Sequence, residues 1–433
     1  MFDKFSDVLS RLAVKINANK YISTIKDSFI DVIPFIIVGS IGTLLGSVIF
    51  STNGLGSVKG FEWVLEMSPW FASLNYATMN ILALLIAYEV GKHLSRFYQQ
   101  DESFVGLLSV VCFVLVSPTT LTAMFGEETQ VISNVLSADV TNSKGLFVAM
   151  IIGMLSVTIF CKLASLKKLK ITLPDAVPPN VAASFTTLLP TILTALIVSG
   201  FAYGFEVIVG TNLSTFIFNT LQTPIAAVFQ HPLGIIAAVF FAALFWICGL
   251  HGASIVTGII NPITIAALQT NMDLVAAGKE ATEIVTKPFW NMYGTMGGFG
   301  CTIGLIIAIF IAGKRDDDKA IAKLSLAPAF FGINEPVIFG IPIVLNPVMA
   351  IPFILAPVVC CIIGYASIYF GFAGKVISDI PWCLPPVVNG FIATGGDIAT
   401  VITQLVCIAV TVVIYLPFVK IRNKEAQMEN QVQ

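Results

Sequence analysis

The sequence predicts an all-α polytopic membrane protein, because it is very apolar, carries few charges and repeats apolar stretches of membrane-crossing length. Of its 433 residues, 56% are hydrophobic and 11% are charged, whereas soluble domains carry about 25% charged residues. The mean hydropathy of +0.90 agrees with this prediction. The net charge of −2 and the lack of a basic tract give no indication of a nucleic-acid partner.

A helix needs about 20 mostly apolar residues to cross the hydrocarbon core. Ordinary crossings are expected at 29–50, 75–94, 103–121, 145–163, 184–209, 233–250, 291–313 and 398–419. The region 337–370 is too long for one crossing and contains four prolines, so we expect a break in it. Residues 251–270 and 371–396 are apolar but interrupted by Gly, Asn and Pro, which favours re-entrant or discontinuous segments. We therefore expect about ten transmembrane helices and two re-entrant hairpins.

Basic residues concentrate on the cytoplasmic side of membrane proteins. Here they gather in the N-terminal segment, after the second and fourth spans, in 314–323 and in 420–424. Because these are alternate connections, both termini are predicted to be cytoplasmic. Met1 to Asp31 lacks the compact apolar run and cleavage site of a signal peptide, and is predicted to be an amphipathic segment near the membrane surface.

No metal or cofactor site is predicted. The eight cysteines show no CxxC or histidine-spaced pattern, and most lie in apolar runs where Cys packs as a small hydrophobe. The run Lys314-Arg315-Asp316-Asp317-Asp318-Lys319 has three consecutive carboxylates, which do not share a helix face. It is interpreted as a solvated cytoplasmic loop.

The two halves of the chain differ in character. Residues 1–215 contain fairly regular spans with few polar groups, which is typical of a scaffold. Residues 216–433 contain the interrupted segments and most of the unusual polar and aromatic side chains. Transporters hold their substrates at broken helices near the bilayer midplane, so we expect 216–433 to carry the substrate.

The most unusual stretch of the second half is Phe330 to Pro336. Gly332 accepts backbone angles that other residues avoid, and Pro336 suits the first turn of a new helix. We expect a helix to end near Phe331, an irregular turn, and a second helix with Glu335 at its N-terminus. Ionisable residues inside the membrane usually mark functional sites, so Glu335 is the first candidate site residue. The alternative is that Glu335 only forms hydrogen bonds with the backbone of a re-entrant turn.

His251 is the second candidate, because it follows an apolar run and opens into Gly252-Ala253-Ser254. A histidine hydrogen-bonded inside a helix bundle is the alternative interpretation. With Glu335 and Asn334 it offers the acceptors and bifunctional groups that sugar hydroxyls need. Trp246 or Trp382 could pack on the apolar faces of sugar rings, although a Trp in a membrane protein is more often an interface anchor.

These motifs resemble the IIC permease subunits of the bacterial phosphotransferase system, in the lactose/cellobiose/diacetylchitobiose branch. The resemblance covers essentially the whole chain. It rests on Gly332–Gly340 around Asn334-Glu335-Pro336, Pro342–Pro347, Pro381-Trp382, Gly390–Asp397 and the spacing Trp246-X4-His251-Gly252.

The resemblance implies a homodimer in the bacterial cytoplasmic membrane, with residues 1–215 as the dimerisation half and 216–433 as the moving, sugar-binding half. It implies import of a disaccharide whose 6-hydroxyl is presented to a phosphocysteine on IIB, with IIA, HPr and enzyme I upstream. Because few residues precede the first predicted span or follow the last one, we expect IIB to be a separate protein. Glu335 and His251 would bind sugar near the 6-hydroxyl, and Glu335 would also act as a general base. Asn334 would either shape the tip of the hairpin or add a hydrogen bond to the sugar, and Gly332 is counted with Asn334, Trp246 and Trp382 among the substrate-binding residues.

Two other classes of protein share some of these features. An ion-coupled secondary transporter would also use broken helices and a Glu–His pair, but would deliver unmodified sugar. An intramembrane hydrolase is less well supported, since the sequence has no HExxH, GxSxG or transmembrane Asp pair. One sequence does not distinguish cellobiose, lactose and diacetylchitobiose as substrates.

Overall fold

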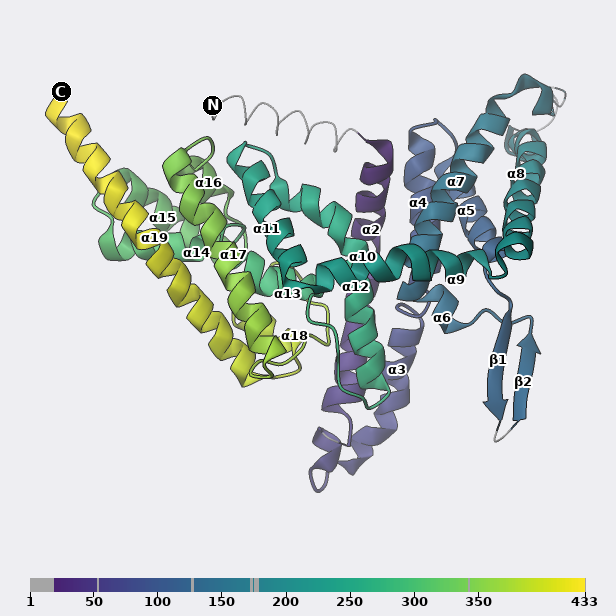
Figure 1. Cartoon of the computed structure of the whole chain (residues 1–433), viewed down its shortest axis with the longest axis horizontal. Helices are drawn as coiled ribbons and strands as arrows, with labels where there is room; N and C mark the ends of the chain where they lie inside the picture. Colours follow the sequence, from purple (N-terminus) through teal and green to yellow (C-terminus); the bar gives the residue numbers. More distant parts are fainter. Residues whose placement is uncertain are drawn as a thin grey trace. The chain divides into compact units, whose positions relative to one another are not determined.

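A computed structural model describes residues 19–52, 54–125, 128–171, 174, 179–341 and 343–432 (Figure 1). The first part of the predicted amphipathic segment, residues 1–18, lies outside this range. From Lys20 the chain already forms the helix that carries the first predicted span. The described residues form two compact units, which we call unit 1 (37–75 and 226–432) and unit 2 (19–36 and 76–225).

Unit 2 is a helical bundle in which α4, α5 and α7 pack closely. Gly91 and Gly153 permit this packing, since a Cβ at Gly91 would lie 2.7 Å from the Cβ of Ser109. The elements of unit 2 are the first part of α2 (Lys20–Thr43), α4 (Leu82–Arg96), α5 (Glu102–Val116), α6 (Ala138–Thr141), η4 (Ser143–Gly145), α7 (Leu146–Ser165), η5 (Lys167–Leu169), α8 (Pro179–Val209), α9 (Leu213–Ile217), η6 (Phe218–Gln222) and the strands β1 (Thr120–Phe125) and β2 (Glu128–Ser133).

The two strands are a small exception to the predicted all-α fold. They pair antiparallel, with Thr120 opposite Ser133. Their segment includes the end of the predicted span 103–121, because α5 ends at Val116 and Ser117-Pro118 starts extended backbone.

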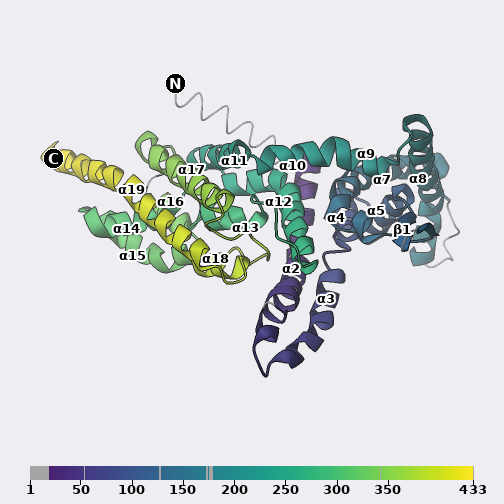
Figure 2. The same cartoon turned by 60° about the horizontal axis from the view of Figure 1, so that its bottom comes forward.

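Unit 1 packs α11, α12 and α17 together and sets α14 and α17 against α19 (Figure 1 and Figure 2). The hydroxyl of Tyr415 on α19 donates to the Gly300 carbonyl at 2.7 Å. The elements of unit 1 are the end of α2, η1 (Leu44–Ile49), η2 (Leu55–Ser57), η3 (Glu62–Met67), α3 (Ser68–Tyr76), α10 (Thr223–Gln230), α11 (Pro232–Ile247), α12 (Gly252–Ala276), α13 (Lys287–Phe289), η7 (Trp290–Gly294), α14 (Thr302–Ala312), α15 (Asp316–Phe330), α16 (Glu335–Gly340), α17 (Pro347–Tyr369), α18 (Val388–Ala393) and α19 (Ile398–Val432).

The polytopic helical fold is confirmed. Within the described residues, six helices are long and apolar enough to cross a membrane, or seven if a pair bent by 80° counts as one span. The expected total of about ten crossings and two re-entrant hairpins stays a prediction. The break predicted in 337–370 is present, because α16 ends at Gly340 and α17 starts only at Pro347.

Three local predictions are wrong. Residues 251–270 form most of the continuous α12, in which Pro262 is tolerated as in other apolar helices. The span predicted at 291–313 is broken before α14, because Gly297, Gly298 and Gly300 all take positive φ. The span predicted at 75–94 is interrupted between α3 and α4.

Candidate functional site

His251 lies at the break between α11 and α12. The chain leaves α11 through Gly249, at φ +80°, and His251 caps α12. Its Nδ1 accepts from the Ser254 amide at 3.2 Å and lies 2.7 Å from the Ser254 hydroxyl. Since a backbone amide can only donate, Nδ1 is the acceptor and the ring hydrogen lies on Nε2 in the neutral imidazole. The exposed ring therefore offers an Nε2–H donor.

Trp246 lies directly against this imidazole, with the two ring centroids 4.5 Å apart. Its side chain is only 4% exposed, and its indole nitrogen has no partner within the described part of the chain. Trp246 therefore supports the histidine ring from behind rather than offering an open face.

Glu335 follows the turn predicted around Gly332. Helix α15 ends at Phe330, Gly332 takes φ +81°, and α16 begins at Glu335, so the predicted break is confirmed. The Glu335 side chain is exposed and, among the described residues, forms no hydrogen bond or ion pair. Its carboxylate oxygens are free to accept from a ligand.

Asn334 is buried, unlike Glu335. Its side-chain amide donates to the Phe299 carbonyl at 2.6 Å and to the Thr302 hydroxyl at 3.0 Å. A Cβ at Gly298 would meet the Asn334 side chain at 2.2 Å. Asn334 therefore ties the turn to the glycine-rich segment before α14, which favours a structural role over contact with a ligand.

The break that carries His251 lies beside the segment between α16 and α17 in unit 1. The Leu345 amide donates to the Ile247 carbonyl at 2.8 Å, and a Cβ at Gly249 would lie 3.4 Å from Val344. The segment that follows α16 thus runs along the break that carries His251. No direct hydrogen bond or ion pair joins His251 to Glu335 among the described residues.

Trp382 lies next to the turn at Gly332. It lies in the irregular segment after α17 and is 60% exposed. A Cβ at Gly332 would lie 3.6 Å from its carbonyl oxygen and 3.7 Å from its ring. Trp382 is therefore the aromatic residue of the predicted set that presents an open face beside the turn.

The Gly395-Gly396-Asp397 motif closes the irregular segment before α19. Asp397 Oδ2 accepts from the Gly374 amide at 2.7 Å, the Thr400 amide at 2.8 Å and the Thr400 hydroxyl at 2.6 Å. Burial opposes ionisation, but these hydrogen bonds outweigh it and lower the pKa of Asp397 below its usual value. Asp397 is thus a structural anchor of this segment.

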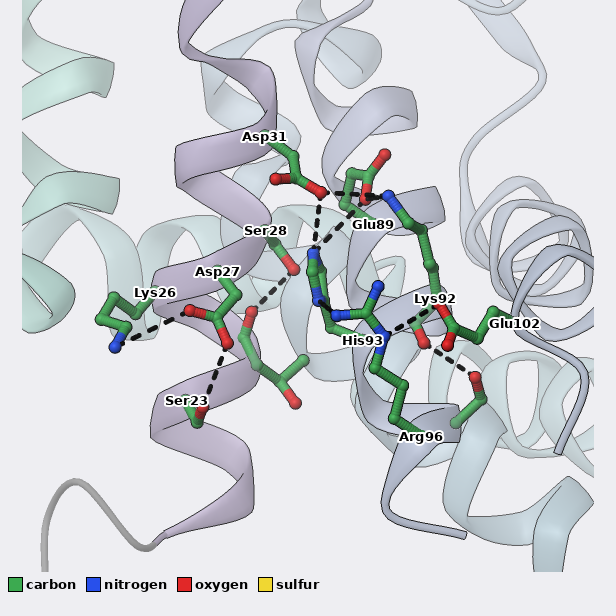
Figure 3. Close-up of polar contacts among 12 residues, drawn as sticks. Ser23, Lys26, Asp27, Ser28, Asp31, Glu89, Lys92, His93, Arg96 and Glu102 are labelled. Carbon is green, nitrogen blue, oxygen red and sulfur yellow. Dashed lines mark hydrogen bonds and ion pairs between the residues drawn. The ribbon is translucent and has the colours of Figure 1, made fainter. Parts of the chain in front are cut away.

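Unit 2 holds one group of side chains with metal-ligand chemistry among the described residues: Asp31, Glu89 and His93 (Figure 3). The Lys92 ammonium already binds both carboxylates, at 3.0 Å from Asp31 and 2.7 Å from Glu89. Arg96 donates to His93 Nδ1 at 3.0 Å, so Nε2 donates to Asp31. This arrangement is a charge network between α2 and α4 rather than a metal centre.

A cavity of about 260 Å³ also lies in unit 2, between the end of α5 and the segment Ser214–Phe218. It shares no residue with the predicted set, all of which belongs to unit 1. Its ion pair Asp139–Lys144 is largely exposed. We therefore base the candidate site on the chemistry of the helix breaks and not on this cavity.

Two buried ion pairs in unit 1 were missed by the sequence reasoning. Asp318 forms a bidentate pair with Arg422 at 2.7 and 3.0 Å. The prediction of a solvated loop is therefore wrong for 316–319, because these residues form the first turn of α15 and Asp318 is buried. Asp379 pairs with Lys287 at 2.6 Å. For the Lys287–Asp379 pair, the only signal in the sequence was an isolated Lys and an isolated Asp, each in apolar surroundings.

Taken together, the interrupted helices and the polar and aromatic groups at their breaks define a polytopic membrane protein of the transporter class. The family model described as "Phosphotransferase system, EIIC" matches residues 26–357. The chain belongs to this family, and the resemblance indicated by its motifs is confirmed.

Several relatives of known name are similar over nearly the whole chain. The oligo-beta-mannoside-specific EIIC component of Bacillus subtilis is 32% identical over 98% of this chain and 94% of its own length. The cellobiose-specific EIIC component of Geobacillus stearothermophilus is 32% identical over 98% of this chain and 95% of its own. The crystal structure of ChbC, the IIC component of the N,N'-diacetylchitobiose-specific phosphotransferase system, has a TM-score of 0.90 at 32% identity, with 98% of both chains covered.

Proposed function

We propose that this chain is the permease component of a phosphoenolpyruvate-dependent phosphotransferase system that imports a β-linked disaccharide. The observation that carries the proposal is the Leu345–Ile247 hydrogen bond, which sets the segment between α16 and α17 along the break that carries His251. Both candidate side chains are exposed. Within the described part of the chain, neither the Glu335 carboxylate nor Nε2 of His251 forms a hydrogen bond with a neighbouring residue. Relatives with names specific for oligo-beta-mannoside, cellobiose and diacetylchitobiose support the substrate class.

His251 would donate from Nε2 to a sugar hydroxyl, because Nδ1 is already held by Ser254. Trp246, packed on the imidazole, would keep the ring oriented. Trp382 would pack its exposed face on the apolar side of a sugar ring, and Asn334 and Gly332 would hold the turn in place.

Glu335 would accept the hydrogen of the sugar 6-hydroxyl. Phosphoryl transfer depends mainly on in-line positioning and on stabilising charge. In the proposed step the O6–H proton moves to the Glu335 carboxylate while O6 forms a bond to phosphorus. The bond between phosphorus and the cysteine sulfur of phospho-IIB breaks, and the thiolate of IIB leaves.

The remaining parts of the system belong to the same proposal. IIB would be a separate protein recharged through IIA, HPr and enzyme I. Residues 1–215 would serve as the dimerisation half of a homodimer and residues 216–433 as the transport half. Both termini would face the cytoplasm of the bacterial cell.

The test separates binding from transfer at Glu335. Purified protein is titrated with cellobiose, lactose and diacetylchitobiose, and single-turnover transfer from phospho-IIB is then followed at saturating sugar. Glu335→Gln should slow transfer by about 100-fold or more and weaken binding less. The exposed Glu280→Gln serves as the matched control. Lost binding with an unchanged transfer rate for bound sugar would make Glu335 a ligand only.

A further inference from the structure

The segment that carries Trp382 contains one buried ion pair. Asp379 lies three residues before Trp382, and its side chain is 0% exposed. Lys287 Nζ lies 2.6 Å from Asp379 Oδ2, while Oδ1 has no partner among the described residues. A buried carboxylate needs a paired charge, so Asp379 is stable in its place only while Lys287 is there.

Lys287 is itself held firmly, at the start of α13. Val285, two residues before Lys287, exchanges two hydrogen bonds with the side-chain amide of Gln230, at 2.9 and 2.8 Å. The Tyr365 hydroxyl on α17 in turn donates to the Gln230 carbonyl at 3.1 Å. The lysine is therefore a fixed point of unit 1 to which a less regular segment can be tied.

The segment around Asp379 is also held by burial of its apolar side chains, since Val376 is 0% and Ile380 is 2% exposed, and by a few hydrogen bonds. Asn271 donates to the Val376 carbonyl at 2.9 Å, and the amides of Ile377 and Ser378 donate to the Ala393 carbonyl. Among the described residues from Asp379 to Trp382, the pair with Lys287 is the one ionic contact. Trp382 then meets Gly332, which lies three residues before Glu335.

We infer that Lys287 and Asp379 are positioning residues, which hold the Trp382 ring beside the Gly332–Glu335 turn so that it can pack on the bound sugar. Neither residue needs to touch the sugar. The inference rests on the proposed function, since it concerns how the same site keeps its aromatic face in place. It also predicts that the pair acts on binding only through Trp382.

The test is a mutant cycle on purified full-length protein, with cellobiose, lactose and diacetylchitobiose as probes. The pair is removed as Lys287→Met with Asp379→Asn, which leaves no unpaired buried charge. Affinity for the sugar that binds best should fall about fivefold to tenfold in the otherwise unchanged protein, and less than about twofold in a Trp382→Ala background. Lys287→Arg, which keeps the charge, should retain most of the affinity.

Hydrogen–deuterium exchange tests the same inference without sugar. Removing the pair should speed exchange in peptides covering 376–384 and leave α14 unchanged. The same substitutions in the exposed pair of unit 2, Lys144→Met with Asp139→Asn, are the control and should change neither exchange in 376–384 nor sugar affinity.

An affinity loss of equal size with and without Trp382, or unchanged exchange in 376–384, would overturn the inference. Wild-type protein that binds none of the three sugars would contradict the proposed function instead. In that case the exchange measurement still decides whether the pair holds this segment.

Discussion

The side-chain amide of Asn334 donates a 2.6 Å hydrogen bond to the carbonyl of Phe299. This bond joins the turn before Glu335 to the glycine-rich segment that precedes α14. The residue next to the proposed catalytic carboxylate is thus buried and structural, while the carboxylate is exposed. A turn fixed in this way can hold the Glu335 carboxylate in place while the Asn334 amide stays buried outside the site.

Asn334→Ala should therefore lower both stability and sugar affinity. The substitution leaves a buried carbonyl and a buried hydroxyl without their donor, which costs about 1 to 3 kcal/mol. Thermal unfolding and sugar titration of the purified protein measure the two effects. Asn212→Ala removes an amide that caps α9 in unit 2, and should lower stability by about 1 kcal/mol without changing affinity. Unchanged affinity in Asn334→Ala would contradict the proposed role.

The two nitrogens of His251 should be separable by substitution. Asn can reproduce the cap that Nδ1 provides but does not reach the position of Nε2, whereas Gln reaches further and caps less well. His251→Asn should keep its stability within about 0.5 kcal/mol and lose about tenfold in affinity, the effect of one hydrogen bond. His251→Gln should lose more stability and less affinity.

His231 gives a matched control for this experiment. It caps α11 through Nδ1, which accepts from the Leu233 amide. His231→Asn should leave both stability and sugar affinity close to wild type. The account of His251 fails if His251→Asn binds sugar as tightly as wild-type protein.

Gly332 and Gly371 should differ in their effect on binding although their backbones are alike. Both take positive φ, at +81° and +75°, so an added Cβ strains each by about 1 kcal/mol. Among the described residues, the Cβ would meet nothing within 4 Å at Gly371 and would make only ordinary van der Waals contact with Trp382, at 3.6 Å, at Gly332. The difference is therefore where the strain falls: Gly332→Ala strains the turn before Glu335 and should weaken sugar binding several-fold, and Gly371→Ala should not. Equal effects on affinity would contradict the arrangement of the turn and Trp382.

Asp397 should make the free energy of unfolding depend on pH in the acidic range. Its pKa is lowered in the folded protein, below an unfolded value of about 3.9. The stabilisation is therefore fully present above the unfolded value and is lost as the pH falls through the folded-state pKa. At pH 7, Asp397→Asn should destabilise the protein by about 1 to 3 kcal/mol. Unfolding measured from pH 7 to pH 3 should show this difference shrinking, and a constant difference would contradict it.

The polytopic helical fold and the break around Gly332 followed from the sequence. A Gly that takes positive φ, followed by Asn-Glu-Pro, ends one helix and starts another whatever surrounds it. The same reasoning failed for 251–270, because Pro262 sits inside an apolar helix without breaking it. It also failed before α14, where three glycines interrupt an otherwise apolar run.

Contacts between distant segments could not be predicted in this way. The hydrogen bond from Leu345 to Ile247 and the ion pairs Asp318–Arg422 and Lys287–Asp379 join segments far apart in the chain. Which isolated Lys meets which isolated Asp depends on how the helices pack, and composition and spacing carry no information about it. The sequence therefore indicated candidate site residues but not the contacts that hold them in place.

The most direct test of the central claim is the chemical form of labelled disaccharide that accumulates in cells expressing this protein, with and without phospho-IIB. A phosphotransferase permease should accumulate phosphorylated sugar, and this product should disappear when IIB is absent. Free sugar that accumulates at an equal rate without IIB, and is lost when the ion gradient collapses, would contradict it and indicate a secondary transporter.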